Sequence, residues 1–259
     1  MYLKPQLGRL MVMKDVALVT VRNSSSRLPN KAIMSIKGNL RSIDIVVERA
    51  KKTDLPVIIT TSTDPSDDIF AEIAKQHDVQ IFRGSLLNKI KRWYDCFNTF
   101  HIENVLIVDG DDLTSNYEIG SRALSQLKSS NFDIITCPED IVTGFFTYAM
   151  KKNAIIKLFS VVPDDNANTD VIARYIEKAK LDVTYVTLED FERNKNIRLT
   201  LDYQEDLEFF RKLYENIDIR ENGKSVITFL ENNKSISEIN FHRQKDFLNN
   251  QAKFNANVK

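Results

Sequence analysis

Short apolar runs alternate with amphipathic segments along the first half of the chain. The runs are rich in Val, Ile and Thr, and several are apolar at every position, which is typical of strands buried on both faces. The intervening segments have the length and periodicity of helices. This alternation predicts an α/β fold with three layers, in which helices cover both faces of a mostly parallel sheet. The expected strands are 16–21, 56–61, 79–82, 104–109 and 132–136, and the expected helices are roughly 40–52, 66–77, 87–100 and 116–129.

The helix expected over 87–100 carries a single apolar stripe. Ile90, Trp93, Tyr94 and Phe97 recur at spacings of three and four residues, which places them on one helical face. A face that packs on the sheet explains this stripe more simply than a cofactor site does.

The alternation loosens after about residue 140. The chain has no internal repeat and no clear linker, so we predict a single domain over 1–259, with a core at about 14–217 and a polar C-terminal extension at about 235–259. We expect the extension to be loosely ordered or to pair with a partner. The other elements expected here are strands at 144–150, 182–188 and 197–202, and helices at 153–159, 169–179 and 203–217.

Composition and charge exclude several classes of partner. The 36 acidic and 36 basic residues balance, so no bulk electrostatic field favours nucleic acid or an anionic membrane. No apolar run approaches the ~20 residues of a membrane span, and the N-terminus lacks the apolar core of a signal peptide. Cys96 and Cys137 lack metal-ligand spacing and fit a reducing compartment. We therefore expect a cytoplasmic protein with small-molecule partners.

Polar clusters follow the predicted strands at their carboxyl ends, where open parallel sheets bind ligands. The first strand runs into "RNSSSRLPNK" (22–31), the second into "TTSTDPSDD" (60–68) and the fourth into "DGDD" (109–112), while "IRLTLD" ends on Asp202. A basic loop beside separated carboxylates predicts a polyphosphate and a divalent cation. With seven glycines and neither GxGxxG nor GxxxxGK[ST], a dinucleotide fold and a P-loop are disfavoured.

Each cluster also has a simpler interpretation. The basic loop could be a solvated turn, and "DGDD" could be a turn in which Gly110 has an unusual backbone angle and Asp111 or Asp112 caps a helix. Asp202 precedes a helix and lies three residues before Glu205, as a capping residue would. For the scattered histidines we expect surface or packing roles; they are His77, His101 and His242.

Taken in order, these motifs resemble a known family. "RNSSSRLPNK" resembles the R-x4-R-L-P-G-K loop of the cytidylyltransferases that activate sugar acids, which include the CMP-KDO and acylneuraminate synthetases. The segments "TTSTDPSDD", "VQIFRGS", "VDGDDL" and "IRLTLDYQEDLEFFRKLYE" are similar to motifs of the related spore-coat polysaccharide branch, over roughly 16–215. Asn30 replaces the usual Gly but tolerates a left-handed backbone. "LLNKIKR" (86–92) replaces an acidic segment, and "DLTSN" replaces a proline-containing one.

The resemblance implies a Rossmann-like nucleotidyltransferase fold of the nucleotide-diphospho-sugar transferase type, with CTP as co-substrate and Mg²⁺ as cofactor. The implied reaction transfers CMP to a hydroxyl of a sugar acid of the KDO or nonulosonic-acid type and releases pyrophosphate, for surface glycan synthesis. The implied catalytic residues are Arg22, Lys31 and Asp111, and the implied metal ligands are Asp111 and Asp202. The implied nucleotide-binding residues are Arg22, Ser25, Arg27, Lys31, Thr61, Ser62, Arg83 and Asp109.

Two alternatives stay open at this point. One is a nucleotidyltransferase of the same fold that uses another NTP, or a sugar-phosphate or phosphonate acceptor. The other is a non-catalytic nucleotide-binding paralogue. Because the related synthetases are often dimers, a homodimer is also possible, with an exposed segment at about 140–165 as its interface.

Overall fold

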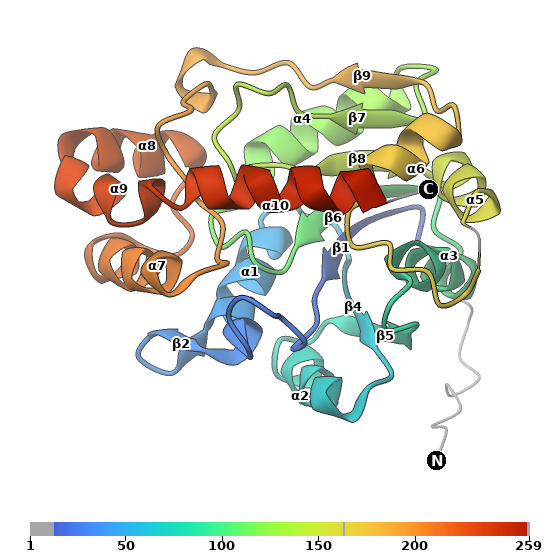
Figure 1. Ribbon diagram of the computed structural model, residues 1–259, viewed down its shortest axis with the longest axis horizontal. Coiled ribbons are helices and arrows are strands. Elements are labelled where there is room, and N and C mark those ends of the chain that lie inside the picture. The colour runs from blue at the N-terminus through green and yellow to red at the C-terminus, as the bar shows by residue number, and fades with distance from the viewer. Residues whose placement is uncertain (1–12, 163, 258–259) are drawn as a thin grey trace.

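A seven-stranded sheet forms the centre of the protein in the computed structural model, which describes residues 13–162 and 164–257 (Figure 1). Its strands are β1 (Asp15–Thr20), β4 (Val57–Ser62), β5 (Gln80–Gly84), β6 (Asn104–Asp109), β7 (Ile134–Thr136), β8 (Tyr148–Lys151) and β9 (Val183–Tyr185). Their order is β5-β4-β1-β6-β8-β7-β9, and β8 runs antiparallel to both of its neighbours. A separate hairpin pairs β2 (Ser35–Lys37) with β3 (Leu40–Arg41).

Helices cover both faces of the sheet. They are α1 (Ser42–Lys51), α2 (Ile69–Gln76), α3 (Lys89–Phe100), α4 (Tyr117–Lys128), α5 (Lys152–Ser160), α6 (Ala173–Lys178), α7 (Gln204–Asn216), α8 (Gly223–Asn232), α9 (Lys234–Phe241) and α10 (Gln244–Asn257). One apolar cluster joins one face of the sheet to α1, α2, α4 and α7, and a second joins the other face to α3, α5 and α6. This arrangement confirms the predicted three-layer, mostly parallel α/β fold.

The first half of the chain follows its hydrophobic pattern. All five predicted strands and all four predicted helices of this half form, with ends shifted by a few residues. In α3 the side chains of Ile90, Trp93 and Phe97 are buried, and the ring of Tyr94 stacks on Phe159 at 4.4 Å between centroids. The apolar stripe is therefore a packing face, as expected.

The second half departs from its predictions at two internal segments and at the C-terminal extension. The segment 197–202 is not a strand, because its amides donate to loop carbonyls, as Leu201 does to Asp111, and only an isolated bridge joins Thr143 and Arg198. The segment 144–150 forms a strand only from Tyr148, and it is less exposed than expected, since its Phe145 side chain is 1% exposed. A homodimer interface at about 140–165 stays a prediction.

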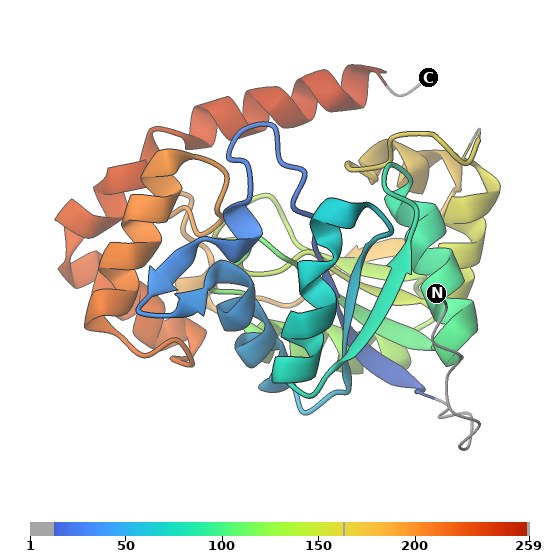
Figure 2. The ribbon, with the colours of Figure 1, turned by 90° about the horizontal axis from the view of Figure 1, so that it is seen from below.

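The C-terminal extension is helical through residue 257, rather than loosely ordered. The sequence pattern missed α8, which begins before the predicted extension and buries Val226, Ile227 and Leu230 against the same core that holds α7. Helix α10 then extends across the carboxyl ends of the strands, above the loop that follows β1 (Figure 2). The fold thus places a C-terminal helix over the edge of the sheet where a site was predicted.

The N-terminal residues 1–12, in which the sequence predicts no signal peptide, lie outside the described residues. In the part of the chain that the structure describes, none of the helices has the length and apolar character needed to cross a membrane.

Candidate active site

A cleft of about 820 Å³ opens at the carboxyl ends of β1 and β6. The loop after β1 forms one wall, and the loop after β6 contributes Asp109, Asp111 and Asp112. Helix α10 roofs the cleft with residues that include Phe247 and Asn250. This volume is in the range of small-molecule binding sites. Most of the residues that the sequence singled out surround this one cleft.

The loop from Arg22 to Lys31 has a defined conformation because both of its ends are anchored. The Asn23 amide donates to Asp67 at 2.8 Å, and the Asn23 side chain donates to the Ser66 carbonyl at 2.6 Å. Asn30 has a φ of 60°, the left-handed backbone expected at the position where the resembled motif has glycine. Between these anchors, the exposed serines at 24 and 26 and the half-buried Ser25 line the cleft.

Two carboxylates from distant parts of the chain converge on one ammonium. Lys31 Nζ lies 2.6 Å from Asp111 and 2.8 Å from Asp202, and the Asp202 side chain is only 1% exposed. Burial alone would lower the pKa of Lys31, but the charges of Asp111 and Asp202 raise it above its usual range. Arg27 also binds Asp202. The predicted catalytic lysine and both predicted metal ligands are therefore one cluster.

The carboxylate of Asp202 faces the cleft because a different residue caps α7. Asp206 accepts hydrogen bonds from the amides of Asp202 at 2.8 Å and Tyr203 at 2.9 Å, so the capping role considered for Asp202 is wrong. Burial alone would raise the pKa of Asp202, but the charges of Lys31 and Arg27 lower it to about 2. Asp202 is thus held as a buried carboxylate beside the basic loop.

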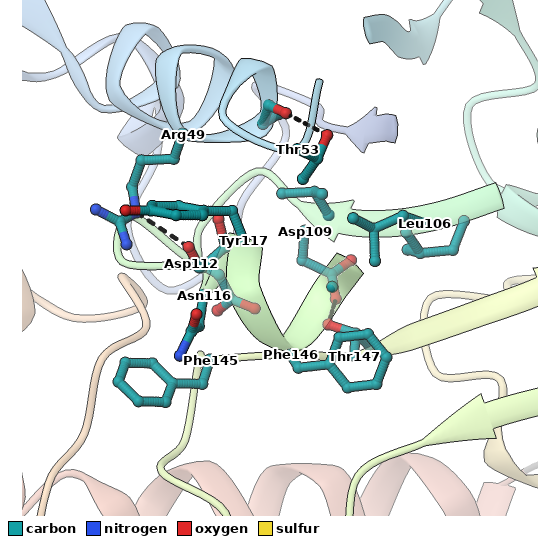
Figure 3. A pocket seen from close by; sticks show the side chains of 15 residues that line it. Arg49, Thr53, Leu106, Asp109, Asp112, Asn116, Tyr117, Phe145, Phe146 and Thr147 are labelled. Atoms are coloured by element: carbon teal, nitrogen blue, oxygen red, sulfur yellow. Dashed lines mark hydrogen bonds between the residues drawn. The ribbon is translucent and has the colours of Figure 1, made fainter. Parts of the chain in front are cut away.

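The other two aspartates of "DGDD" lie deeper. Burial, with the charge of Asp111 as a further cause, raises the pKa of Asp109 and raises that of Asp112 well above its usual range. Asp109 accepts a hydrogen bond from Thr147 at 2.9 Å. Behind both lies a cavity of only about 20 Å³, and the aromatic side chains drawn around it in Figure 3 explain the poor solvation. This cavity is too small for a nucleotide.

The turn interpretations of "DGDD" are wrong in two respects. The side chain of Asn116, not of Asp111 or Asp112, caps α4. Gly110 does not have a positive φ, so glycine is required at this position for a steric reason instead. A Cβ at this position would lie 2.7 Å from Cβ of Val21, so the loop after β6 can approach β1 only without a side chain there.

Arg22 binds a different wall of the cleft from Arg27 and Lys31. Its guanidinium donates to the Asp170 carboxylate at 2.6 and 2.7 Å, on a segment between α5 and α6. Lys89 and Arg92, at the start of α3, also line this wall. Sequence reasoning missed these two cations, although the basic segment "LLNKIKR" was the available signal.

Three predicted nucleotide-binding residues are absent from the described lining of the cleft. They are Thr61, Ser62 and Arg83. Ser62 Oγ donates to Asp67 at 2.5 Å, and Arg83 donates to the Ser62 carbonyl at 2.9 Å and forms an ion pair with Asp68 at 2.6 Å. Ser62 therefore supports the anchor of the basic loop through Asp67, and Arg83 binds the segment that carries Asp67. Their nucleotide-binding role stays a prediction.

A sequence model of the family described as Cytidylyltransferase matches residues 16–254. The chain belongs to the cytidylyltransferase family. This membership confirms the predicted enzyme class, a nucleotidyltransferase. The matched residues include every predicted site residue and most of the helix that roofs the cleft.

Several known proteins are similar to this chain over most of its length. The uncharacterized protein MJ1063 of Methanocaldococcus jannaschii is 25% identical over 91% of this chain and 98% of that protein. A solved cytidylyltransferase from Leptospira borgpetersenii is 23% identical, with a TM-score of 0.79 over 87% of this chain and 97% of that one. A CMP:2-keto-3-deoxy-manno-octonic acid synthetase solved with CTP is 14% identical, with a TM-score of 0.60 over 78% of this chain and 99% of that one. At these identities the two structures show a shared fold.

The two carboxylates that meet at Lys31 are suitable ligands for a hard divalent cation. Among residues 13–162 and 164–257, no three His, Cys, Asp or Glu side chains are grouped as a protein-only metal site. Mg²⁺, however, usually takes one or two protein carboxylates and completes its octahedron with phosphate oxygens and water. Asp111 and Asp202 already converge on one cation, the Lys31 ammonium. Their geometry therefore fits Mg²⁺ bound together with a polyphosphate.

Proposed function

We propose that this cytidylyltransferase transfers CMP from CTP to a hydroxyl group of a sugar acid of the KDO or nonulosonic-acid type. The acceptor oxygen attacks the α-phosphorus, the bond from that phosphorus to the bridging oxygen breaks, and pyrophosphate leaves. The hydroxyl proton is released to solvent. We place this reaction in the cytoplasm, where its product would supply surface glycan synthesis.

One observation carries the proposal: the convergence of Asp111 and Asp202 on Lys31 beside a basic loop, in the lining of a nucleotide-sized cleft. Phosphoryl chemistry requires mainly positioning and compensation of negative charge, and this cluster has the groups for both. The fold shared with a synthetase solved with CTP supports CTP as the donor.

The chain's own residues would divide the work. Lys31 and Arg27 would leave the carboxylates and bind phosphate oxygens, so that the leaving pyrophosphate meets positive charge. Mg²⁺ held by Asp111 and Asp202 would stabilise charge at the α-phosphate and lower the pKa of the attacking hydroxyl. Among the described residues lining the cleft there is no histidine. Proton removal by such a base is therefore not part of the proposal.

The test is pyrophosphate release with Mg²⁺ and each of the four NTPs, against KDO, N-acetylneuraminate and other nonulosonic acids. The proposal expects release with CTP and one acid. Release with another NTP, or with a phosphorylated acceptor only, would assign the alternative transferase. No release together with no thermal stabilisation by any NTP would favour a paralogue that has lost the chemistry. Asp111→Asn serves as the inactive control.

A further inference from the structure

The cations of the basic loop do not converge on one point. Arg27 and Lys31 reach the Asp111–Asp202 wall, whereas Arg22 turns toward the start of α3. There it donates to both carboxylate oxygens of Asp170, at 2.6 and 2.7 Å. Both bonds come from Nη2 of Arg22, a donor group that can equally bind phosphate oxygens.

Two further cations lie near Asp170. Lys89 Nζ donates to the Asp170 carbonyl at 2.5 Å and lies 5.2 Å from the centroid of the Trp93 ring. Arg92 is 1% exposed and donates to the Ser85 carbonyl at 2.7 Å, but its buried Nε has no hydrogen-bond partner among the described residues. The wall therefore holds three cations and a buried donor without an acceptor.

This cluster is short of negative charge. Burial, together with the charge of Arg22, lowers the pKa of Arg92 to about 10. The nearby carboxylate of Asp67 is engaged by Ser62 and the Asn23 amide, and the carboxylate of Asp170 pairs with Arg22. Burying an uncompensated cation is costly, so such a wall is suited to an incoming anion.

Asp170 lies on a segment that is held against the start of α3 by the neighbouring Thr169, not by the Asp170 carboxylate. Thr169 is buried, accepts a hydrogen bond from the Ile90 amide at 3.0 Å and donates its own amide to the Leu87 carbonyl. The Asp170 side chain is 39% exposed at the cleft. Its carboxylate can therefore leave Arg22 by rotating, while Thr169 keeps the segment on α3.

We propose that Arg22, Lys89 and Arg92 form a phosphate subsite for the tail of the nucleotide, and that Asp170 occupies this subsite until the nucleotide displaces it. The inference rests on the proposed function, because it takes the nucleotide to be the ligand. It adds two residues to the phosphate site, and it makes Asp170 a competitor that weakens nucleotide binding.

The test measures dissociation constants for CTP, inorganic pyrophosphate and CMP by calorimetry. Asp170→Asn should tighten CTP and pyrophosphate by about 3- to 10-fold, the range expected when a partly exposed ion pair no longer competes. CMP should change by less than about twofold, because it lacks the phosphate tail. Lys89→Gln should weaken CTP and pyrophosphate by about 3- to 10-fold.

Two matched controls come from the same elements. Asp165→Asn removes an exposed carboxylate from the segment that carries Asp170, and Lys91→Gln removes a cation of α3 that pairs with Asp95 at 3.0 Å. Neither residue is among the described residues lining the cleft, so both variants should bind CTP like the unchanged protein.

The outcomes separate this inference from the proposed function. If the unchanged protein binds neither CTP nor pyrophosphate, both are overturned. If it binds them, but Asp170→Asn binds no more tightly than Asp165→Asn, the competitor role of Asp170 is overturned alone. If Asp170→Asn melts at a lower temperature, the Lys89→Gln variant tests the subsite in its place. CTP and pyrophosphate affinities of Lys89→Gln equal to those of Lys91→Gln would overturn the subsite.

Discussion

Asp202 gives the sharpest quantitative prediction, because it is both a proposed metal ligand and a buried charge. Its carboxylate binds Lys31 at 2.8 Å, Arg198 at 3.2 Å and Arg27, and its side chain is 1% exposed. Asp202→Asn keeps the shape of the side chain and removes its charge. Lys31 and Arg198 each keep another carboxylate partner, Asp111 and Asp206 respectively, so the variant should still fold.

The size of the effect follows from the pKa. Burial alone would raise the pKa of Asp202. The charges of Lys31 and Arg27 outweigh this effect and lower the pKa from 3.8 to about 2. That difference corresponds to about 2–3 kcal/mol of stabilisation at neutral pH, or about 5–10 °C in melting temperature for a chain of this size. A carboxyl whose pKa is lower in the folded state stabilises the fold above pH 3.8, and this contribution is lost as the pH falls toward 2. At pH 3 about half of it remains.

The assay is urea unfolding of the unchanged protein and Asp202→Asn at pH 7 and pH 3, with pyrophosphate release measured at pH 7. We expect a loss of about 2–3 kcal/mol at pH 7, a smaller loss at pH 3, and almost no turnover. Equal stability at pH 7, or a difference that does not shrink at pH 3, would refute the electrostatic reasoning. Near-normal turnover would instead refute the assignment of Asp202 as a metal ligand.

Three further predictions use simpler measurements. Asp111→Asn should reduce pyrophosphate release by about 10²–10³-fold, and near-normal turnover would contradict the role of Asp111. Because the Asp111 side chain is 28% exposed, the urea midpoint of this variant should hardly change. Gly144→Ala should cost at least about 2 kcal/mol in urea unfolding, since φ is +90° and a Cβ would collide with the Leu199 carbonyl oxygen. Asn30→Val should lower the free energy of unfolding by about 1–2 kcal/mol, and Asn30→Gly should lower it much less, because φ is 60° at this position. Equal melting temperatures for the two variants would contradict this prediction.

Local sequence patterns determined the sheet and the position of the site. The apolar runs around β1, β4 and β6 are buried on both faces, so composition alone identifies them as strands. Residues just after such strands must lie at the carboxyl edge of the sheet, and this rule alone places the basic loop and Asp111 at that edge. The pattern was wrong at 197–202, where apolar alternation reflects burial between loops rather than strand pairing.

Which cation meets which carboxylate was decided only by the tertiary structure. Arg22 and Lys31 belong to one ten-residue motif, yet Arg22 binds Asp170, 148 positions away, while Lys31 binds Asp202, 171 positions away. The capping of α7 by Asp206, which leaves Asp202 facing the cleft, likewise depends on Arg198 and Asn240 packed around it. Hydrophobic periodicity is a local property that the sequence displays directly, whereas ion pairs between distant loops depend on how the packed core positions those loops, and no local pattern records that.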